Sequence, residues 1–155
     1  MKSRFQVVLS HPLLLLLLRL FLAFVLIGAA WPKILCPASF SVSVAAYRVA
    51  PASIINLAAV CIPWIEFLTG LGLLAGYRTR SFAVLTVLLM TLFCAVIVLA
   101  LARGVTAESC GCNVPGFSEE LGPGTLARDV LFLSAALYLV FFKGGKWSLD
   151  RIIKS

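Results

Sequence analysis

Long apolar runs separated by short polar segments dominate the chain. Four runs are close to the length that a helix needs to cross the hydrocarbon core of a bilayer, about 20 residues. They extend over residues 12–31, 52–77, 81–102 and 125–142. The third run contains no charged residue, and each of the others contains one or two. The pattern predicts an all-α integral membrane protein, a four-helix bundle that forms a single domain over residues 1–155.

Glycine and threonine residues indicate where several of these helices end or begin. Gly76 and Gly104 follow the second and third runs, where a helix favours glycine as its C-terminal cap. Thr125 is expected to cap the start of the fourth helix. The first run could also be a secretory signal peptide. We favour a retained span, because the run is longer than a signal core of about 7–15 residues and contains Arg19.

The overall composition agrees with a membrane protein. Hydrophobic residues make up 62% of the chain and charged residues only 12%, against about 25% charged residues in a typical soluble domain. The net charge of +7 is carried mainly between the apolar runs. No basic stripe alternates with aromatic residues, so we expect membrane lipid as a partner and no nucleic acid.

The lysines and arginines predict the orientation of the bundle. With four spans, both termini and the 78–80 segment share one side, which carries eight of these residues, against three on the other: Lys33, Arg48 and Arg103. Because positive charge accumulates in the cytoplasm, both termini are expected there, in a bacterial inner membrane. The loops 32–51 and 103–124 would then face the oxidising periplasm.

The second of these loops contains the sharpest chemical motif, Cys110-Gly111-Cys112. Residues i and i+2 can bring their Cα atoms within the roughly 4.4–6.8 Å that a disulfide requires, and glycine gives the backbone the necessary freedom. A strained, small-ring disulfide is expected to be labile and oxidising. Cys110 and Cys112 are therefore the candidate catalytic residues, as a thiol–disulfide exchange pair.

Other interpretations of the cysteines stay open. Cys110 and Cys112 could form a structural bridge, with each other or with Cys36. A metal site is disfavoured, because structural zinc takes four ligands and the single histidine, His11, lies at the other face of the membrane. Cys61 and Cys94 lie within spans and are expected to be small packing residues.

The charged residues inside the spans should face the bundle interior, because they are costly in hydrocarbon. Their depths allow Arg19 to pair with Glu66, either to fix helix register or in a proton or quinone role. Arg128 and Asp129 begin the fourth helix just after the CxC motif. Arg128 would stabilise a thiolate or bind a lipid phosphate, and the sequence does not choose between these.

Taken together, the residues resemble the methylamine utilisation protein MauE family, a branch of the DoxX-like four-helix membrane proteins. The resemblance extends from about residue 18 to 139, and no single motif decides it. It rests on Arg19, Gly28, Lys33, Ala45-Ala46-Tyr47-Arg48-Val49, Pro63-Trp64-Ile65-Glu66-Phe67, Gly70, Gly76, Arg103-Gly104, Cys110-Gly111-Cys112 and Arg128. The chain departs from the family at residues 113–116 after the CxC motif, at Asp129 and at Cys36.

The resemblance implies a membrane component for thiol–disulfide or electron transfer. Such a protein would support disulfide formation or maturation of periplasmic proteins, with a thioredoxin-like or cysteine-rich substrate protein as its partner. A quinone is a cofactor by analogy with other four-helix disulfide-generating enzymes only. The sequence leaves open whether the chain is an enzyme, a thiol–disulfide oxidoreductase. The alternatives are a non-enzymatic assembly subunit with a structural CxC bridge and a small transporter.

Overall fold

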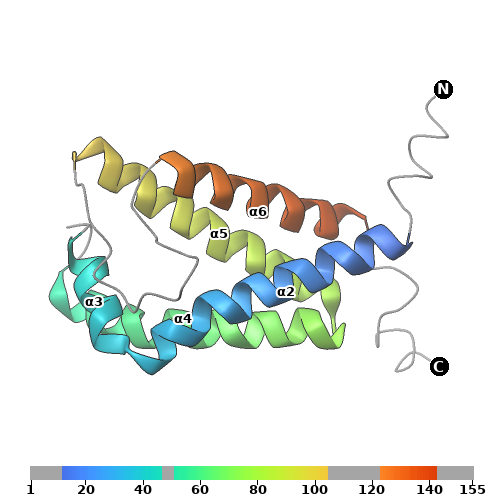
Figure 1. The fold of residues 1–155 in the computed structure, drawn as a ribbon, viewed down its shortest axis with the longest axis horizontal. Helices are drawn as coiled ribbons and strands as arrows, with labels where there is room; N and C mark the ends of the chain where they lie inside the picture. The colour runs from blue at the N-terminus through green and yellow to red at the C-terminus, as the bar shows by residue number, and fades with distance from the viewer. Residues whose placement is uncertain (1–11, 47–50, 105–122, 143–155) are drawn as a thin grey trace.

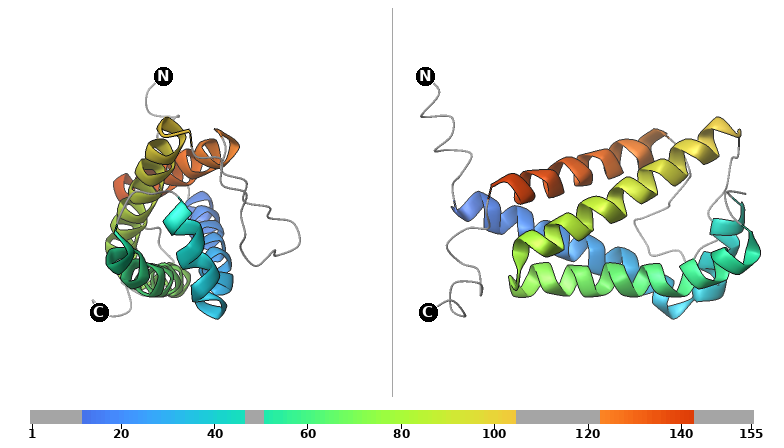
Figure 2. Two further views of the ribbon diagram at one scale, coloured as in Figure 1. Left: turned by 90° about the vertical axis from the view of Figure 1, so that its left-hand side faces the viewer. Right: turned by 180° about the vertical axis from the view of Figure 1, so that it is seen from behind.

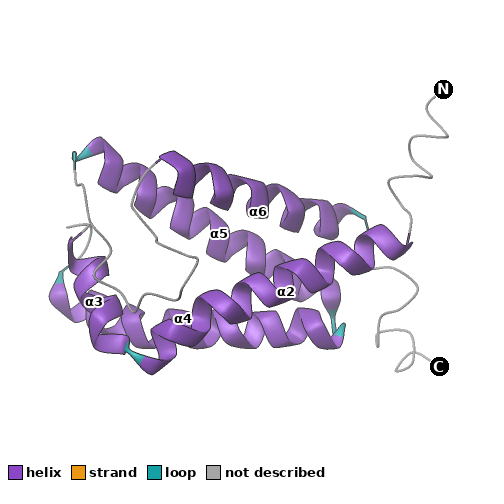
Figure 3. Cartoon of the chain, in the orientation of Figure 1, coloured by secondary structure: helices purple, strands orange, loops and turns teal. Residues whose placement is uncertain are grey.

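The computed structural model describes residues 12–46, 51–104 and 123–142, and within these ranges it is helical without any strand. Figure 3 shows the described residues as helices with a few short turns and no strand. They are α2 (Pro12–Leu35), α3 (Pro37–Ala46), α4 (Ala52–Ala75), α5 (Thr79–Ala102) and α6 (Pro123–Phe141). The predicted all-α fold class is confirmed.

Four of these helices are long and apolar enough to cross a membrane. The segments that qualify are Pro12–Leu35, Ser53–Ala75, Thr79–Ala102 and Gly124–Phe141. A helix of 24 residues is about 36 Å long at 1.5 Å per residue, which exceeds a hydrocarbon core of about 30 Å. The chain is therefore a multi-pass membrane protein whose long helices are embedded in lipid.

The long helices run alternately up and down the bundle (Figures 1 and 2). The start of α2, the end of α6 and the turn between α4 and α5 lie at one end, which we term the turn end. The short helix α3, the end of α5 and the start of α6 lie at the opposite end, termed the α3 end. α2 packs closely against α4 and α5 against α6, and the two antiparallel pairs contact each other through α4–α5 and α2–α6.

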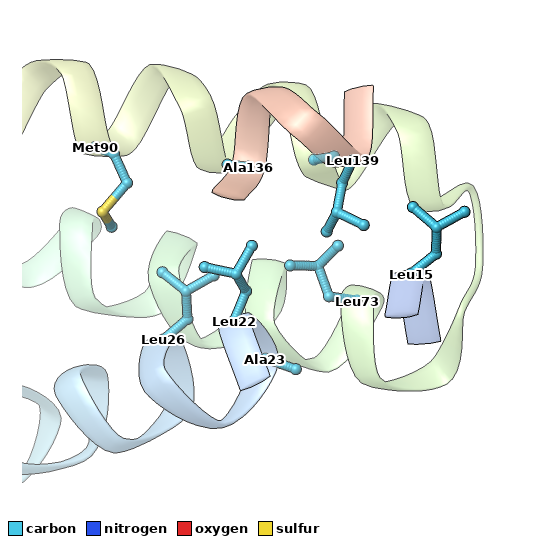
Figure 4. Packing of buried hydrophobic residues seen from close by; sticks show 9 residues of the cluster. Leu15, Leu22, Ala23, Leu26, Leu73, Met90, Ala136 and Leu139 are labelled. Carbon is cyan, nitrogen blue, oxygen red and sulfur yellow. The ribbon is translucent and has the colours of Figure 1, made fainter. Parts of the chain in front are cut away.

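A small apolar core joins the two pairs. Figure 4 shows Leu22 and Leu26 of α2 meeting Leu73 of α4, with Met90 of α5 and Leu139 of α6 on the other side. In contrast, large apolar side chains such as those of Leu17, Phe24, Leu57 and Leu88 are exposed on the outside of the bundle. In water such a surface would promote aggregation, whereas in a bilayer it is the lipid-contacting surface.

The observed helix ends confirm some expectations and correct others. Gly76 and Gly104 both adopt the left-handed conformation after α4 and α5, with φ of 69° and 67°, as predicted. α2 does not end at Trp31 but continues to Leu35. α6 begins at Pro123, so Thr125 is inside the helix and the prediction of a cap there was wrong.

Candidate functional site

The predicted catalytic cysteines, Cys110 and Cys112, lie outside the described residues. The described residues on either side of their segment, Gly104 after α5 and Pro123 at the start of α6, lie toward the α3 end. Cys36 lies at the junction of α2 and α3, where its N–H donates to the carbonyl of Pro32 at 3.0 Å. It is half-buried near the same end of the bundle.

The two cysteines within spans occupy different environments. The thiol of Cys94, on α5, is half-buried, in agreement with the expected packing role, whereas Cys61, on α4, is exposed on the surface. The Asp129 carboxylate on α6 is close enough to the Cys94 thiol to interact with it electrostatically. Cys94 therefore lies in the interface between α5 and α6, at the level of a buried acidic group.

The central polar feature of the described bundle is an ion pair between α2 and α4. Lys33 Nζ donates to Glu66 Oε2 at 3.2 Å and to Oε1 at 3.5 Å. Only 1% of the Glu66 side chain is exposed, against 18% for Lys33. Glu66 thus forms the buried member of the pair and Lys33 the more accessible one.

The direction of the two side chains explains how they meet. Side chains on a helix lean toward its N-terminus. Because α2 and α4 are antiparallel, Lys33 leans away from the α3 end and Glu66 leans toward it. The two groups therefore approach each other from opposite directions, although Lys33 is only two residues before the end of α2.

Two aromatic rings complete the environment of Lys33. Its ammonium lies 5.2 Å from the ring centroid of Phe40 on α3 and 5.2 Å from that of Phe93 on α5. The electron-rich face of an aromatic ring attracts a cation at this distance. Through Lys33, the ion pair therefore joins four helices: α2, α3, α4 and α5.

The predicted pairing of Arg19 with Glu66 is wrong. The Arg19 side chain is buried, and its guanidinium lies against Gly76: a Cβ atom at this glycine would be 2.6 Å from Arg19 Nη1. Gly76 is about 15 Å from Glu66 along α4, at 1.5 Å per residue. Arg19 lies near the turn end. The ion-pair partner of Glu66 is Lys33 and not Arg19.

Arg128 and Asp129, at the start of α6, contact each other. Arg128 Nε lies 3.2 Å from Asp129 Oδ1, and the guanidinium carbon lies 6.0 Å from the ring centroid of Phe132. Asp129 is buried against α5, while about a third of the Arg128 side chain is exposed. Neither the thiolate role nor the lipid-phosphate role suggested for Arg128 is tested by these contacts.

The pairing of Lys33 was not predicted from the sequence, because the first helix was expected to end at Trp31 and Lys33 to lie in a loop. Pro32 suggested a helix end, yet α2 continues past it, and Cys36 donates its N–H to the Pro32 carbonyl. One feature of the sequence could have revealed the pair: Lys33 lies less than one helical turn after the end of the apolar run 12–31. From there, a long side chain leaning toward the N-terminus reaches into the bundle.

The fold and this site define a class: a four-span membrane protein with a lysine–glutamate pair in its interior and a CxC motif between its last two spans. The chain belongs to the family of the methylamine utilisation protein MauE, whose family model matches residues 11–142. That match includes Lys33 and Glu66 as well as the CxC motif. The resemblance noted in the sequence is therefore confirmed.

Three curated proteins, each described as methylamine utilization protein MauE, are similar to this chain. The protein of Methylorubrum extorquens is 31% identical over 133 residues, which cover 86% of this chain and 72% of that protein. Those of Paracoccus denitrificans and Methylophilus methylotrophus are each 28% identical, over 83% and 84% of this chain and 69% of each relative. No solved structure matches the chain.

Proposed function

We propose that this protein is a membrane thiol–disulfide component that supports disulfide formation or maturation of periplasmic proteins, with Cys110 and Cys112 as its exchanging pair. The observation that carries the proposal is the topology of the bundle. The segment with both cysteines connects the end of α5 to the start of α6, at the end opposite to the one where α2 begins and α6 ends. This topology supports a role for the two cysteines on one side of the membrane.

The distribution of positive charge supports an outward-facing α3 end. Lys33, one of the three residues first assigned to that side, is drawn into the bundle by Glu66. The asymmetry then becomes eight residues against two, Arg48 and Arg103. Under the positive-inside rule, both termini are cytoplasmic, and Cys110 and Cys112 belong to the periplasmic side of an inner membrane.

The exchange reaction follows from the chemistry of thiols. A thiolate of a partner protein attacks one sulfur of the Cys110–Cys112 disulfide, and a mixed disulfide forms. The partner's second thiol then attacks that mixed disulfide. The partner gains an S–S bond, and Cys110 and Cys112 take up its two electrons and two protons as thiols.

The relatives suggest the context of this reaction. Because three MauE proteins of methylamine utilisation are similar over most of the chain, we place the protein in the maturation of periplasmic proteins for that process. Its partner is a thioredoxin-like or cysteine-rich periplasmic protein. An enzymatic thiol–disulfide oxidoreductase activity follows from the same proposal.

The proposal is tested by alkylating the thiols of the membrane-embedded chain after equilibration at defined ratios of reduced to oxidised glutathione. A redox-active pair changes from disulfide to dithiol across this range, because strained disulfides have higher potentials than structural ones, which lie below roughly −300 mV. The variant Cys61→Ser, altered on the lipid-facing surface, serves as the control and should titrate as the wild type does.

A second experiment identifies the partner. Cys112→Ala and Cys110→Ala each leave one thiol that can hold a mixed disulfide, and mass spectrometry of the trapped complex names the captured protein. Full complementation by the Cys110→Ser, Cys112→Ser double variant would contradict the proposal. The protein would then be a non-enzymatic assembly subunit that does not require a bridge between these cysteines.

A further inference from the structure

The exposed face of the short helix α3 is apolar. Ala38, Val42 and Ala45 follow one another at intervals of about one helical turn, and all three are exposed, Val42 to 62%. We term them the outer face of α3. No charged residue occurs from residue 34 to 46. A helix that covers a protein in water has the opposite pattern, with polar residues on its outer face. The outer face of α3 therefore favours an environment other than water.

The serine hydroxyl groups of α3 find their partners within the same helix. Ser41 Oγ donates to the carbonyl of Ala38 at 2.8 Å, and Ser43 Oγ donates to that of Ser39 at 3.1 Å. Polar groups that are satisfied in this way need no hydrogen bond from water. This is a condition that a segment must meet to lie in hydrocarbon.

The position of Phe40 shows how far α3 reaches into the bundle. Its ring centroid and that of Phe93 on α5 are each 5.2 Å from the Lys33 ammonium, so the two centroids cannot be farther apart than twice this distance. Phe93 precedes Ala102, the last residue of α5, by nine positions, or about 14 Å at 1.5 Å per residue. The ring of Phe40 therefore lies within the length of the α5 span and not beyond its end.

The two helices that α3 contacts carry exposed apolar side chains where they adjoin it. Leu35 is exposed at the end of α2, and Ile54 and Leu57 are exposed in the first two turns of α4. Large apolar side chains of this kind belong to the lipid-contacting surface of the bundle. Figures 1 and 2 show α3 beside the end of α2 and the start of α4. Its outer face thus continues a surface that already contacts lipid.

We propose that α3 is embedded in the half of the bilayer at the α3 end, with its outer face against the acyl chains of the lipid. Phe40 is on the opposite side of the helix, at about 100° per residue, and its ring covers Lys33 of the buried ion pair. Residues 34–46 of the loop expected to face the periplasm then belong to the membrane, and a partner protein in water has no access to the outer face. The inference is independent of the thiol–disulfide function.

The test places the fluorescent amino acid Anap in place of Val42 in the full chain, reconstituted in lipid nanodiscs, with all native cysteines retained. Two quenchers are compared: iodide, which stays in water, and a phospholipid with a doxyl group near the headgroup end of its acyl chain. We expect the doxyl lipid to quench the emission from position 42 strongly and iodide to leave it nearly unchanged. The emission maximum should shift to the blue of that of free Anap in buffer.

Leu57 is the matched control, because it is exposed on a long span next to α3. Anap in its place should respond to both quenchers as Anap at position 42 does. Free Anap in the buffer is the reference for full access of iodide. If the chain with Anap at position 42 does not accumulate, Ala38 is replaced instead, because it is exposed on the same face of α3.

Two other outcomes overturn the inference. Strong quenching by iodide at position 42, but not at position 57, would place the outer face of α3 in water and leave it open to a partner protein. No quenching at position 42 by either reagent would show that protein covers this face, from a second copy of the chain or from another part of the same chain. Neither result bears on the glutathione titration of Cys110 and Cys112, so the two proposals fail separately.

Discussion

Glu66 is tolerated in the bundle interior because its carboxylate lies 3.2 Å from the Lys33 ammonium. Moving two charged groups from water into the bundle interior is costly. The attraction between the Lys33 ammonium and the Glu66 carboxylate offsets this cost only while both groups are present. Loss of one partner from a buried pair costs about 3–5 kcal/mol, whereas replacing both by apolar groups is often neutral.

We predict that Glu66→Gln and Lys33→Met each lower the free energy of unfolding by about 3 kcal/mol, and that the double variant recovers at least half of the summed loss. A denaturation titration in mixed detergent micelles measures this. The control pair is Arg19→Met with Glu66→Gln, whose effects should add within about 0.5 kcal/mol because the residues are far apart. Strong coupling in the control pair would contradict the structure.

Gly76 and Gly104 both have positive φ, but only Gly76 lies against Arg19. Comparing alanine variants at the two positions therefore separates the stability loss from backbone strain from the loss caused by displacing Arg19. A Cβ atom at Gly76 would lie 2.6 Å from Arg19 Nη1, whereas one at Gly104 would have no atom within 4 Å. Gly104→Ala should therefore cost about 1–2 kcal/mol for the left-handed backbone alone. We predict that Gly76→Ala costs more, because it also displaces a buried guanidinium. Equal losses in chemical denaturation would show that Arg19 adapts freely.

At the scale of helices, the close approach of α2 and α4 positions the ion pair. A Cβ atom at Gly70 would lie 2.7 Å from Ile27 Cγ1 and 3.1 Å from the Ala23 carbonyl oxygen. Small residues at helix interfaces let backbones approach in membranes, where packing replaces the hydrophobic effect as the force for association. The reach of Lys33 to Glu66 depends on this separation.

We therefore predict that Gly70→Ala lowers the free energy of unfolding by about 1–3 kcal/mol, as overpacking does. Gly28→Ala on α2 is the matched control, because a Cβ atom there meets nothing within 4 Å. It should leave stability unchanged or raise it, since alanine is the better helix former. Comparable losses in both variants would argue against a tight contact at Gly70.

The sequence predicted the helices well because a bilayer imposes a simple length and polarity requirement on each span. All four spans agree with the structure to within a few residues, and Gly76 and Gly104 follow the predicted helices. The short helix α3 was missed, since its ten residues carry no strong apolar periodicity. The pairing of Lys33 was missed for a related reason: it depends on which helix faces which, and the sequence pattern does not encode this.

At the scale of the whole molecule, the alternating direction of the long helices places the start of α2 and the end of α6 at the same end of the bundle. The thiol–disulfide exchange role of Cys110 and Cys112 was inferred from the spacing of the two cysteines and the expected topology. This role stays a prediction. What the structure adds is a buried polar site assembled from α2, α3, α4 and α5. No local pattern indicates such an assembly.

The orientation is open to direct measurement. A reporter fused after Ser155 should behave as cytoplasmic, and one inserted near Ser118 as periplasmic, because positive charge is concentrated on the side of the termini. Reversing the charge bias, with Arg78→Glu and Arg80→Glu, should weaken this preference. The opposite reporter pattern in the wild-type chain would reverse the orientation and remove the oxidising compartment from the proposed function.

The separation of Lys33 and Glu66 along the chain has a consequence for biogenesis. The two residues are 33 positions apart, so at roughly 5–20 residues per second Lys33 is synthesised roughly 2–7 s before its carboxylate partner. During this interval the ammonium can remain at the membrane surface, with its aliphatic stem along the helix and Phe40 as the first ring to reach it. We expect Lys33 to move into the bundle only when α4 has entered the bilayer, because Glu66 on that helix is its ion-pair partner. Ribosome-bound chains stopped before Glu66 should leave Lys33 open to amine-reactive reagents, and longer chains should protect it.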